Sequence, residues 1–318
     1  MIIFLTGHRK SGTTLLLRLF DNHPDIDVYP TDLTLFYNYF PYYTMNYDNK
    51  KILIEKIISV IDQTINKFFL SQNLIHKKKV KSLNIKLKKN LKNINLKSKK
   101  EVFQKTLDHW ENLKGRKLKK IILIKETSQS IYFDEYLKFF KNMKMVNIVR
   151  DPRDNYASIK SGQKKYYSKN NIDYLQNLAS TLFRSRQDLL STFYNINHKK
   201  FKFITYEDLV ANTRKVMKQL CYFLGIKFYN TLLNPSLGKY KYYGNNFSHK
   251  INGISNKNKN NWKKRITTEE KNIIEFYLSD VIKIFNYRSS KNLIKIKKDF
   301  SKFNDKINSR YFFRDVYK

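Results

Sequence analysis

Short runs of apolar residues alternate along this chain with segments whose apolar positions recur every three or four residues. The short runs predict strands at Ile2–Thr6, Lys120–Lys125, Met145–Arg150 and Phe201–Tyr206. The helical spacing between them predicts helices at about Thr13–Asn22, Ile131–Lys141, Arg153–Ser161, Tyr174–Asn195 and Glu207–Leu224. Strands and helices in alternation are typical of a parallel sheet with helices on both faces, so the expected fold class is α/β.

Residues 48–115 interrupt this alternation, because they carry helical patterns and no strand signal. Within them, Lys77–Lys100 is crowded with Lys and Asn and has no Asp or Glu. We expect an exposed, lysine-rich helical insertion. Its charge is either a solvated surface without function or a surface that attracts an acidic acceptor. The expected organisation is one α/β domain over residues 1–290 that includes this insertion, followed by a basic extension over residues 291–318.

The composition is strongly basic, with 63 Lys and Arg against 26 Asp and Glu in 318 residues. Such a charge suggests nucleic acid as a partner. However, lysine outnumbers arginine and no nucleic-acid motif is present. The abundance of Lys, Asn, Ile, Tyr and Phe is typical of an AT-rich genome. We therefore expect no specific nucleic-acid partner, a preference for anionic ligands, and a charge that would allow contact with an anionic surface.

Cysteine and histidine content narrows the class of protein further. One cysteine, Cys221, excludes an internal disulfide framework, and the six histidines lack the spacing of metal ligands, so no metal is expected. A strand that begins at Ile2 leaves no room for a signal peptide, and no apolar run reaches the roughly 18 residues of a membrane span. We expect a cytoplasmic protein.

The loop after the first predicted strand reads G-H-R-K-S-G-T-T over residues 7–14. Backbone N–H groups at such a strand–loop–helix junction bind anions, aided by the helix dipole. A nucleoside-triphosphate loop places its lysine directly after the second glycine, where this chain has Thr13. The lysine lies instead at Lys10, ahead of Gly12. An ordinary glycine-rich turn is the alternative for this segment alone.

A second segment, R-D-P-R-D-N-Y-A-S over residues 150–158, follows the third predicted strand. Asp151 can cap the next helix, with Pro152 at its favoured first position. Arg150 offers a planar fork of donors and Ser158 a hydroxyl two turns into the helix, a pair suited to a phosphate monoester. The alternative is a capped helix whose arginine pairs with a surface carboxylate.

These segments resemble the motifs of sulfotransferases that use 3′-phosphoadenosine-5′-phosphosulfate (PAPS). K-S-G-T-T-L from residue 10 is similar to the family's 5′-phosphosulfate loop, and Arg150 with Ser158 eight positions on is similar to its 3′-phosphate motif. Y-E-D at 206–208 resembles the segment whose tyrosine lies near the adenine, which implies that role for Tyr206. The loop before Trp262 resembles the family's cofactor-closing loop.

The resemblance covers most of residues 2–44 and 120–265, and it implies a P-loop-like sulfotransferase architecture with PAPS as the cofactor. It assigns cofactor binding to Lys10, Ser11, Gly12, Thr13, Thr14, Arg150, Ser158, Tyr206, Ser255 and Lys257.

The catalytic residues that the resemblance implies are Lys10, which would neutralise the bridging oxygen, and Asp32 as the base. H-P-D at 23–25 matches the tyrosyl-protein relatives, whose carboxylate position falls on Thr31, one residue before Asp32. The histidine base of cytosolic relatives is replaced by Thr127. Glu126 is the reserve candidate, and Asp32 has a second interpretation as the N-cap of a helix over Leu33–Phe40.

The expected function is transfer of a sulfuryl group from PAPS to a hydroxyl or amine of an acceptor, which could be a glycan, a lipid, a small molecule or a protein tyrosine. Aromatic residues in Phe36–Tyr47 either line an acceptor cleft or belong to the core. The alternatives are an ATP-dependent kinase-like enzyme, disfavoured by Thr13, and a non-catalytic anion-binding protein. The sequence does not indicate an oligomeric state.

Overall fold

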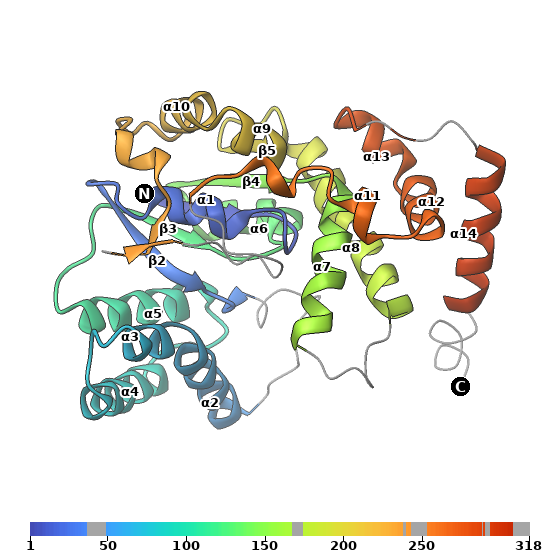
Figure 1. Ribbon diagram of the computed structural model, residues 1–318. Coiled ribbons are helices and arrows are strands. Elements are labelled where there is room, and N and C mark those ends of the chain that lie inside the picture. Colours follow the sequence, from blue (N-terminus) through green and yellow to red (C-terminus); the bar gives the residue numbers. More distant parts are fainter. Residues whose placement is uncertain are drawn as a thin grey trace.

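A five-stranded parallel sheet organises the chain (Figure 1). The structure, a computed structural model, describes residues 1–36, 49–166, 174–237, 240–242, 253–287, 289 and 293–307. The strand order is β2-β3-β1-β4-β5, and all four pairings are parallel. The strands are β1 (Ile2–Thr6), β2 (Ile26–Asp32), β3 (Ile121–Lys125), β4 (Met143–Val149) and β5 (Phe201–Thr205). The expected α/β class is confirmed.

The four strands expected from the sequence are confirmed, whereas β2 escaped prediction. Asp27, Pro30 and Asp32 interrupt its apolar run. Proline removes a donor from a sheet and is tolerated at an edge strand, and β2 pairs with β3 alone among the described strands. Its register shifts between Val28 and Asp32. Asp32 therefore ends an edge strand rather than starting a helix, and Leu33–Leu35 are not helical, so the helix-cap interpretation is wrong there.

The side chains of each strand point alternately to two separate apolar layers, as the period of two in a strand requires. In β1, Ile3 and Leu5 face α1 (Thr13–Phe20) and α10 (Thr213–Leu224). Phe4 faces the opposite layer, where it packs on Phe36 and Tyr136 with ring centroids 6.0 and 4.5 Å away. Both faces of the sheet are thus covered by helices.

Four further helices belong to this framework, namely α6 (Phe133–Phe139), α7 (Pro152–Tyr166), α8 (Tyr174–Asn195) and α9 (Tyr206–Ala211). Of these, α6, α7 and α9 each come after a strand, and α8 comes after α7. The segment expected to be one helix over Glu207–Leu224 is broken at Asn212 into α9 and α10, and the helix expected over Ile131–Lys141 is shorter and starts with a 3₁₀ turn, Ser130–Tyr132. α8 has the expected bounds.

Residues 50–114 are helical, as expected, and contain α2 (Lys50–Ile61), a π-helical turn (Asp62–Asn66), α3 (Lys67–Ser71), α4 (Lys77–Lys92) and α5 (Lys99–Lys114). These helices lie together below the sheet in Figure 1. Phe103 and Trp110 of α5 are buried in the same layer as Phe4. The lysines of α4 point mostly to solvent.

The C-terminal part holds a short hairpin, β6 (Ser236–Leu237) with β7 (Tyr240–Lys241), then α11 (Trp262–Arg265), α12 (Thr268–Tyr277), α13 (Ser279–Ile284) and α14 (Leu293–Ile307). Phe300 of α14 packs against Phe276 of α12 with ring centroids 4.7 Å apart. α14 lies within the basic extension expected over residues 291–318. Of the aromatic segment Phe36–Tyr47, only Phe36 belongs to the described residues, and its ring is in the core.

Candidate active site

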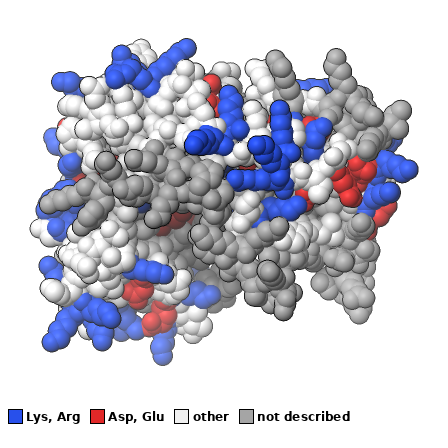
Figure 2. All heavy atoms as spheres, viewed as in Figure 1, with Lys and Arg blue, Asp and Glu red and all other residues white. Residues whose placement is uncertain are grey.

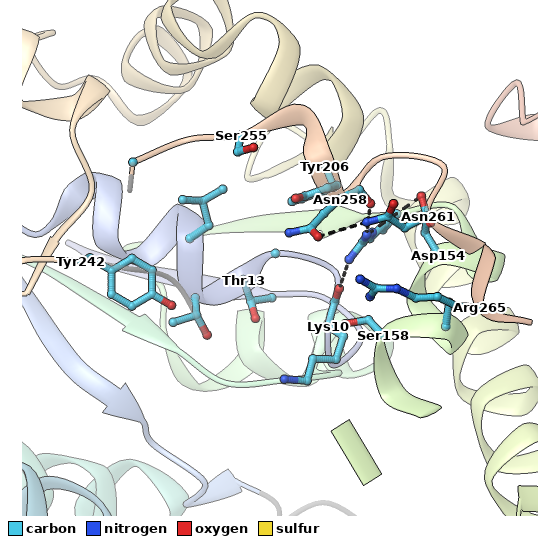
Figure 3. Close-up of a pocket in the computed structure, with 16 residues that line it drawn as sticks. Lys10, Thr13, Asp154, Ser158, Tyr206, Tyr242, Ser255, Asn258, Asn261 and Arg265 are labelled. Carbon is cyan, nitrogen blue, oxygen red and sulfur yellow. Dashed lines mark hydrogen bonds and ion pairs between the residues drawn. The ribbon is translucent and has the colours of Figure 1, made fainter. Parts of the chain in front are cut away.

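A pocket lies at the end of the sheet where the carboxyl ends of the parallel strands come together (Figure 3). In open α/β sheets ligands bind at this end of the strands. The space between its lining side chains amounts to about 840 Å³, which includes open solvent. Its lining residues are Lys10, Gly12, Thr13, Thr14, Leu15, Arg150, Asp154, Ala157, Ser158, Tyr206, Tyr242, Gly253, Ser255, Asn258, Asn261 and Arg265.

The loop between β1 and α1 wraps tightly because of its second glycine. Gly12 has φ +102°, and a Cβ there would lie 2.6 Å from the Tyr206 ring. Only glycine fits both the conformation and the space. Asn155 of α7 anchors the loop by donating to the Arg9 carbonyl at 2.7 Å and to Ser11 Oγ at 3.2 Å. The loop is therefore fixed before any ligand binds.

Lys10 lies in an excess of positive charge. Burial, together with the positive charges of Lys125, Arg9 and Arg150, lowers the pKa of its ammonium to about 8. Its φ of +67° is rare for a residue with a side chain. A cation held among cations, next to helix N-terminal N–H groups, creates a local demand for an anion.

Arg150 joins three parts of the pocket. Its guanidinium donates to the Lys10 carbonyl at 2.9 Å and to the Asn258 carbonyl at 2.7 Å, and it stacks 4.3 Å from the centre of the Tyr206 ring. Asp151 caps α7 by accepting the Arg153 N–H at 2.9 Å, as expected. Arg150 is thus held by backbone carbonyl groups of two other segments, and not by a surface carboxylate.

A polar cluster lies beside the glycine loop at the ends of β2 and β3. Lys125 Nζ donates to Asp32 Oδ2 at 2.7 Å and to Thr14 Oγ1 at 3.2 Å. Thr127 Oγ1 donates to Asp32 Oδ1 at 3.2 Å. The Asp32 side chain is 35% exposed, so it remains accessible to a ligand. Through Lys125 and Thr14 this carboxylate is connected to the loop that carries Lys10.

The residues nominated from the sequence do not all reach the pocket. Ser11 is buried, Lys257 is exposed, and neither lines the pocket. Ser255 does line it, and its hydroxyl accepts the Lys257 N–H at 3.2 Å. Glu126, the reserve base, is 1% exposed and accepts the Phe36 N–H at 2.8 Å. The other nominated cofactor residues line the pocket together.

Several lining residues were missed, namely Asp154, Tyr242, Asn258, Asn261 and Arg265. Figure 3 shows Arg265 reaching towards Ser158. The only sequence signal for Asp154 is its place four residues after Arg150, one turn into α7. Arg265 was hidden in a basic run, and Asn258 contributes a backbone carbonyl, for which a sequence has no signal.

Basic side chains dominate the surface around the pocket. Figure 2 shows them gathered over α7 and α11, and again over α2 and α4, where some acidic groups lie among them. Within the described residues there is no group of three or more His, Cys, Asp or Glu able to hold a metal ion. The described helices also include none with the length and apolar character needed to cross a bilayer.

A parallel α/β sheet with an anion-binding loop at its edge is the architecture of a broad class of group-transfer proteins. Within that class the chain belongs to the sulfotransferase family, whose model, described as "Sulfotransferase family", matches residues 3–230. The resemblance drawn from the sequence is confirmed. The general reaction supported by this membership is sulfuryl transfer.

Solved structures agree with this assignment at the level of the fold. The sulfotransferase domain of the curacin biosynthetic pathway is 19% identical, with a TM-score of 0.59 over 91% of this chain and 98% of that domain. The sulfotransferase domain of the Synechococcus PCC 7002 olefin synthase is 18% identical, with a TM-score of 0.61 over 91% of this chain and 95% of that domain. A search among curated proteins gives no significant match.

Proposed function

We propose that the protein transfers a sulfuryl group from PAPS to a hydroxyl or amine of an acceptor. The observation that carries this proposal is the convergence of Lys10, Arg150 and Ser158, from two strand ends and one helix, on a single pocket. Two cationic groups spaced along one cavity suit a ligand with phosphate at both ends of a nucleoside. Thr13 stands where a nucleoside-triphosphate loop has its lysine, and this disfavours the kinase alternative.

The pocket has the donors that such a ligand needs. The N–H groups of the loop and of the first turn of α1, with Lys10, would hold the 5′-phosphosulfate. Arg150, Ser158 and Arg265 would hold the 3′-phosphate, while Tyr206 and Tyr242 offer aromatic surface for the adenine. When bound, PAPS supplies the sulfuryl group and leaves as adenosine 3′,5′-bisphosphate (PAP).

The residues around the loop suit the two charge changes of sulfuryl transfer. Lys10 would stabilise the negative charge that grows on the leaving phosphate oxygen. Asp32 would accept the proton of the attacking acceptor group. It is favoured over Glu126 because Asp32 is 35% exposed beside Thr14, whereas Glu126 is buried and engaged with a backbone N–H.

A cytoplasmic location of the protein stays a prediction.

Nucleotide-dependent thermal stabilisation tests the cofactor assignment. A ligand that binds only the folded state raises the melting temperature by mass action. PAP should stabilise the wild-type protein much more than AMP or ATP at equal concentration. The gain should be lost in Arg150→Ala and retained in Asp208→Asn, a surface carboxylate whose neutralisation leaves the pocket intact. Equal shifts with PAP and AMP would refute the 3′-phosphate site.

Turnover separates an enzyme from a protein that only binds anions. Incubation with ³⁵S-labelled PAPS and an extract of the source cells should label an acceptor with the wild-type protein and not with Lys10→Met. Binding of PAP without any labelled product, across extracts that support a positive-control sulfotransferase, would favour the non-catalytic alternative.

A further inference from the structure

Asp154 is the one carboxylate among the described residues that line the pocket. It lies in the first turn of α7, four residues after Arg150, and is 2% exposed. A buried negative charge next to a proposed phosphate site needs an explanation, because it repels the ligand unless it is neutralised.

Backbone N–H groups of the 253–265 segment supply that neutralisation. The Asn260 N–H donates to Asp154 Oδ2 at 2.7 Å, and the Trp262 N–H donates to Oδ1 at 2.9 Å. Hydrogen bonds from N–H groups to a buried carboxylate are among the stronger ones in proteins. Both oxygens of the carboxylate are therefore engaged by one segment, which also forms one wall of the pocket.

Arg150 is attached to the same segment. Its guanidinium lies 4.0 Å from Asp154 Oδ2, at the limit of an ion pair, and donates to the Asn258 carbonyl at 2.7 Å. If the segment moved away, Asp154 would lose both N–H donors and Arg150 would be the cation at hand to replace them. The guanidinium would then be drawn away from a phosphate and the bare carboxylate would repel it.

We infer that Asp154 is a positioning residue that makes seating of the 253–265 segment and binding of a 3′-phosphate one coupled event. The inference rests on the proposed function. With the segment seated, the carboxylate is occupied by N–H groups and Arg150 keeps its positive charge for the ligand. Specificity for a 3′-phosphorylated nucleotide then depends on Asp154, although Asp154 itself does not bind the phosphate.

A second anchor keeps the segment folded when Asp154 is changed. The Trp262 ring stacks on the Arg153 guanidinium at 4.5 Å, and Arg153 is itself held by Asp151 at 2.6 Å and Glu275 at 2.7 Å. Asp154→Asn should therefore loosen the segment without unfolding the protein. Asp208→Asn is a matched control, because Asp208 is an exposed acid in the first turn of α9 and its carboxylate accepts from Thr205 within its own helix cap.

Amide hydrogen exchange, resolved over residues 255–265, tests the contact without any ligand. In Asp154→Asn the amides of Asn260 and Trp262 should exchange at least tenfold faster than in the wild-type protein, and Asp208→Asn should leave them unchanged. In the wild-type protein PAP should slow these amides more than AMP does. Unchanged exchange in Asp154→Asn, or equal protection by PAP and AMP, would overturn the inference.

Affinities for the two nucleotides test the coupling itself. Asp154→Asn should weaken PAP at least tenfold and AMP less than threefold, so that the preference for PAP collapses. An unchanged or greater preference would show that Asp154 does not position the phosphate site, and would overturn the inference alone. A wild-type protein without a preference for PAP would instead refute the proposed function, and this inference with it.

Discussion

At the scale of single residues, the site is defined by positive charges that lie close together. Lys125 and Arg150 lie close enough to Lys10 to lower the pKa of its ammonium. Of these three residues, Lys125 is the one that pairs with Asp32. In water such a cluster would be unfavourable, and it persists here because the backbone of several elements holds it together. An anion that enters the site relieves this repulsion, so binding and protonation are linked.

The pH dependence of PAP binding should report Lys10. Its pKa of about 8 in the free protein should rise when an anion binds, so binding above pH 8 requires proton uptake. The association constant for PAP should fall as the pH rises from 8 to 9, by a factor of up to about 10. Lys10→Met should bind PAP more weakly at pH 7 and lose this slope. The same slope in Lys10→Met would assign the proton to another group.

Asp32→Asn should separate the base from the binding site. The amide keeps the shape of the carboxylate but does not take up a proton near neutral pH, so kcat should fall by a factor on the order of 100 or more. The Kd for PAP should change less than threefold. Glu126→Gln is the matched comparison, and full activity in Asp32→Asn with loss in Glu126→Gln would move the base to the end of β3.

At the scale of elements, the edge strand β2 is held to the end of α5 by an ionic cluster around the buried Asp27. Asp27 accepts hydrogen bonds from Lys114 at 2.6 Å, Arg116 at 2.6 Å and the Lys119 N–H at 2.7 Å. These donors lower the pKa of Asp27 to about 2, against the opposing effect of burial. The cluster fastens β2, and with it Asp32 at the far end of the strand, to the end of α5.

The stability of the fold should therefore depend on pH through Asp27. A carboxyl whose pKa is lower in the folded state stabilises the protein above its ordinary pKa of 3.8, and this contribution disappears as the pH falls from about 5 to 2. Asp27→Asn should lower the free energy of unfolding at pH 7 by roughly 2 kcal/mol and flatten its pH dependence between pH 5 and 3. Denaturant titrations at several pH values measure both. An unchanged pH profile in Asp27→Asn would mean that other carboxyl groups control acid unfolding.

At the scale of the whole molecule, a net charge of +37 acts against the compact state. Much of this charge lies on lysines that point to solvent, where its effect is long-ranged and screened by salt. The same field increases the local concentration of anionic ligands around the pocket. Folding and ligand capture therefore depend on ionic strength in opposite ways.

Salt should accordingly stabilise this protein while it weakens cofactor capture. Raising NaCl from 20 to 200 mM shortens the Debye length from about 20 to about 7 Å. The melting temperature should rise by several degrees, and the association rate for PAP should fall several-fold. Sucrose at equal osmolarity is the control for non-ionic effects. A melting temperature that is independent of NaCl would show that self-repulsion contributes little.

The sequence by itself determined four of the five strands and the glycine loop, because both depend on local patterns. Short apolar runs place β1, β3, β4 and β5, and the glycine spacing around Lys10 marks the proposed anion site. Arg150 and Ser158 were nominated because they lie eight positions apart, one at a strand end and one two turns into the next helix, and both line the pocket. Such features are encoded within a dozen neighbouring positions, where periodicity and turn chemistry act directly.

Only the tertiary structure decided which distant groups meet. The structure identifies β2 by its pairing with β3, because Pro30 and two acids interrupt the apolar pattern of this strand in the sequence. The partners of Asp32 come from residues 125 and 127, nearly a hundred positions away. Asp154 met its backbone donors more than a hundred positions further along the chain. A side chain that binds backbone N–H groups does not require a particular residue type in its partner. Such a contact can therefore be seen only in the folded structure.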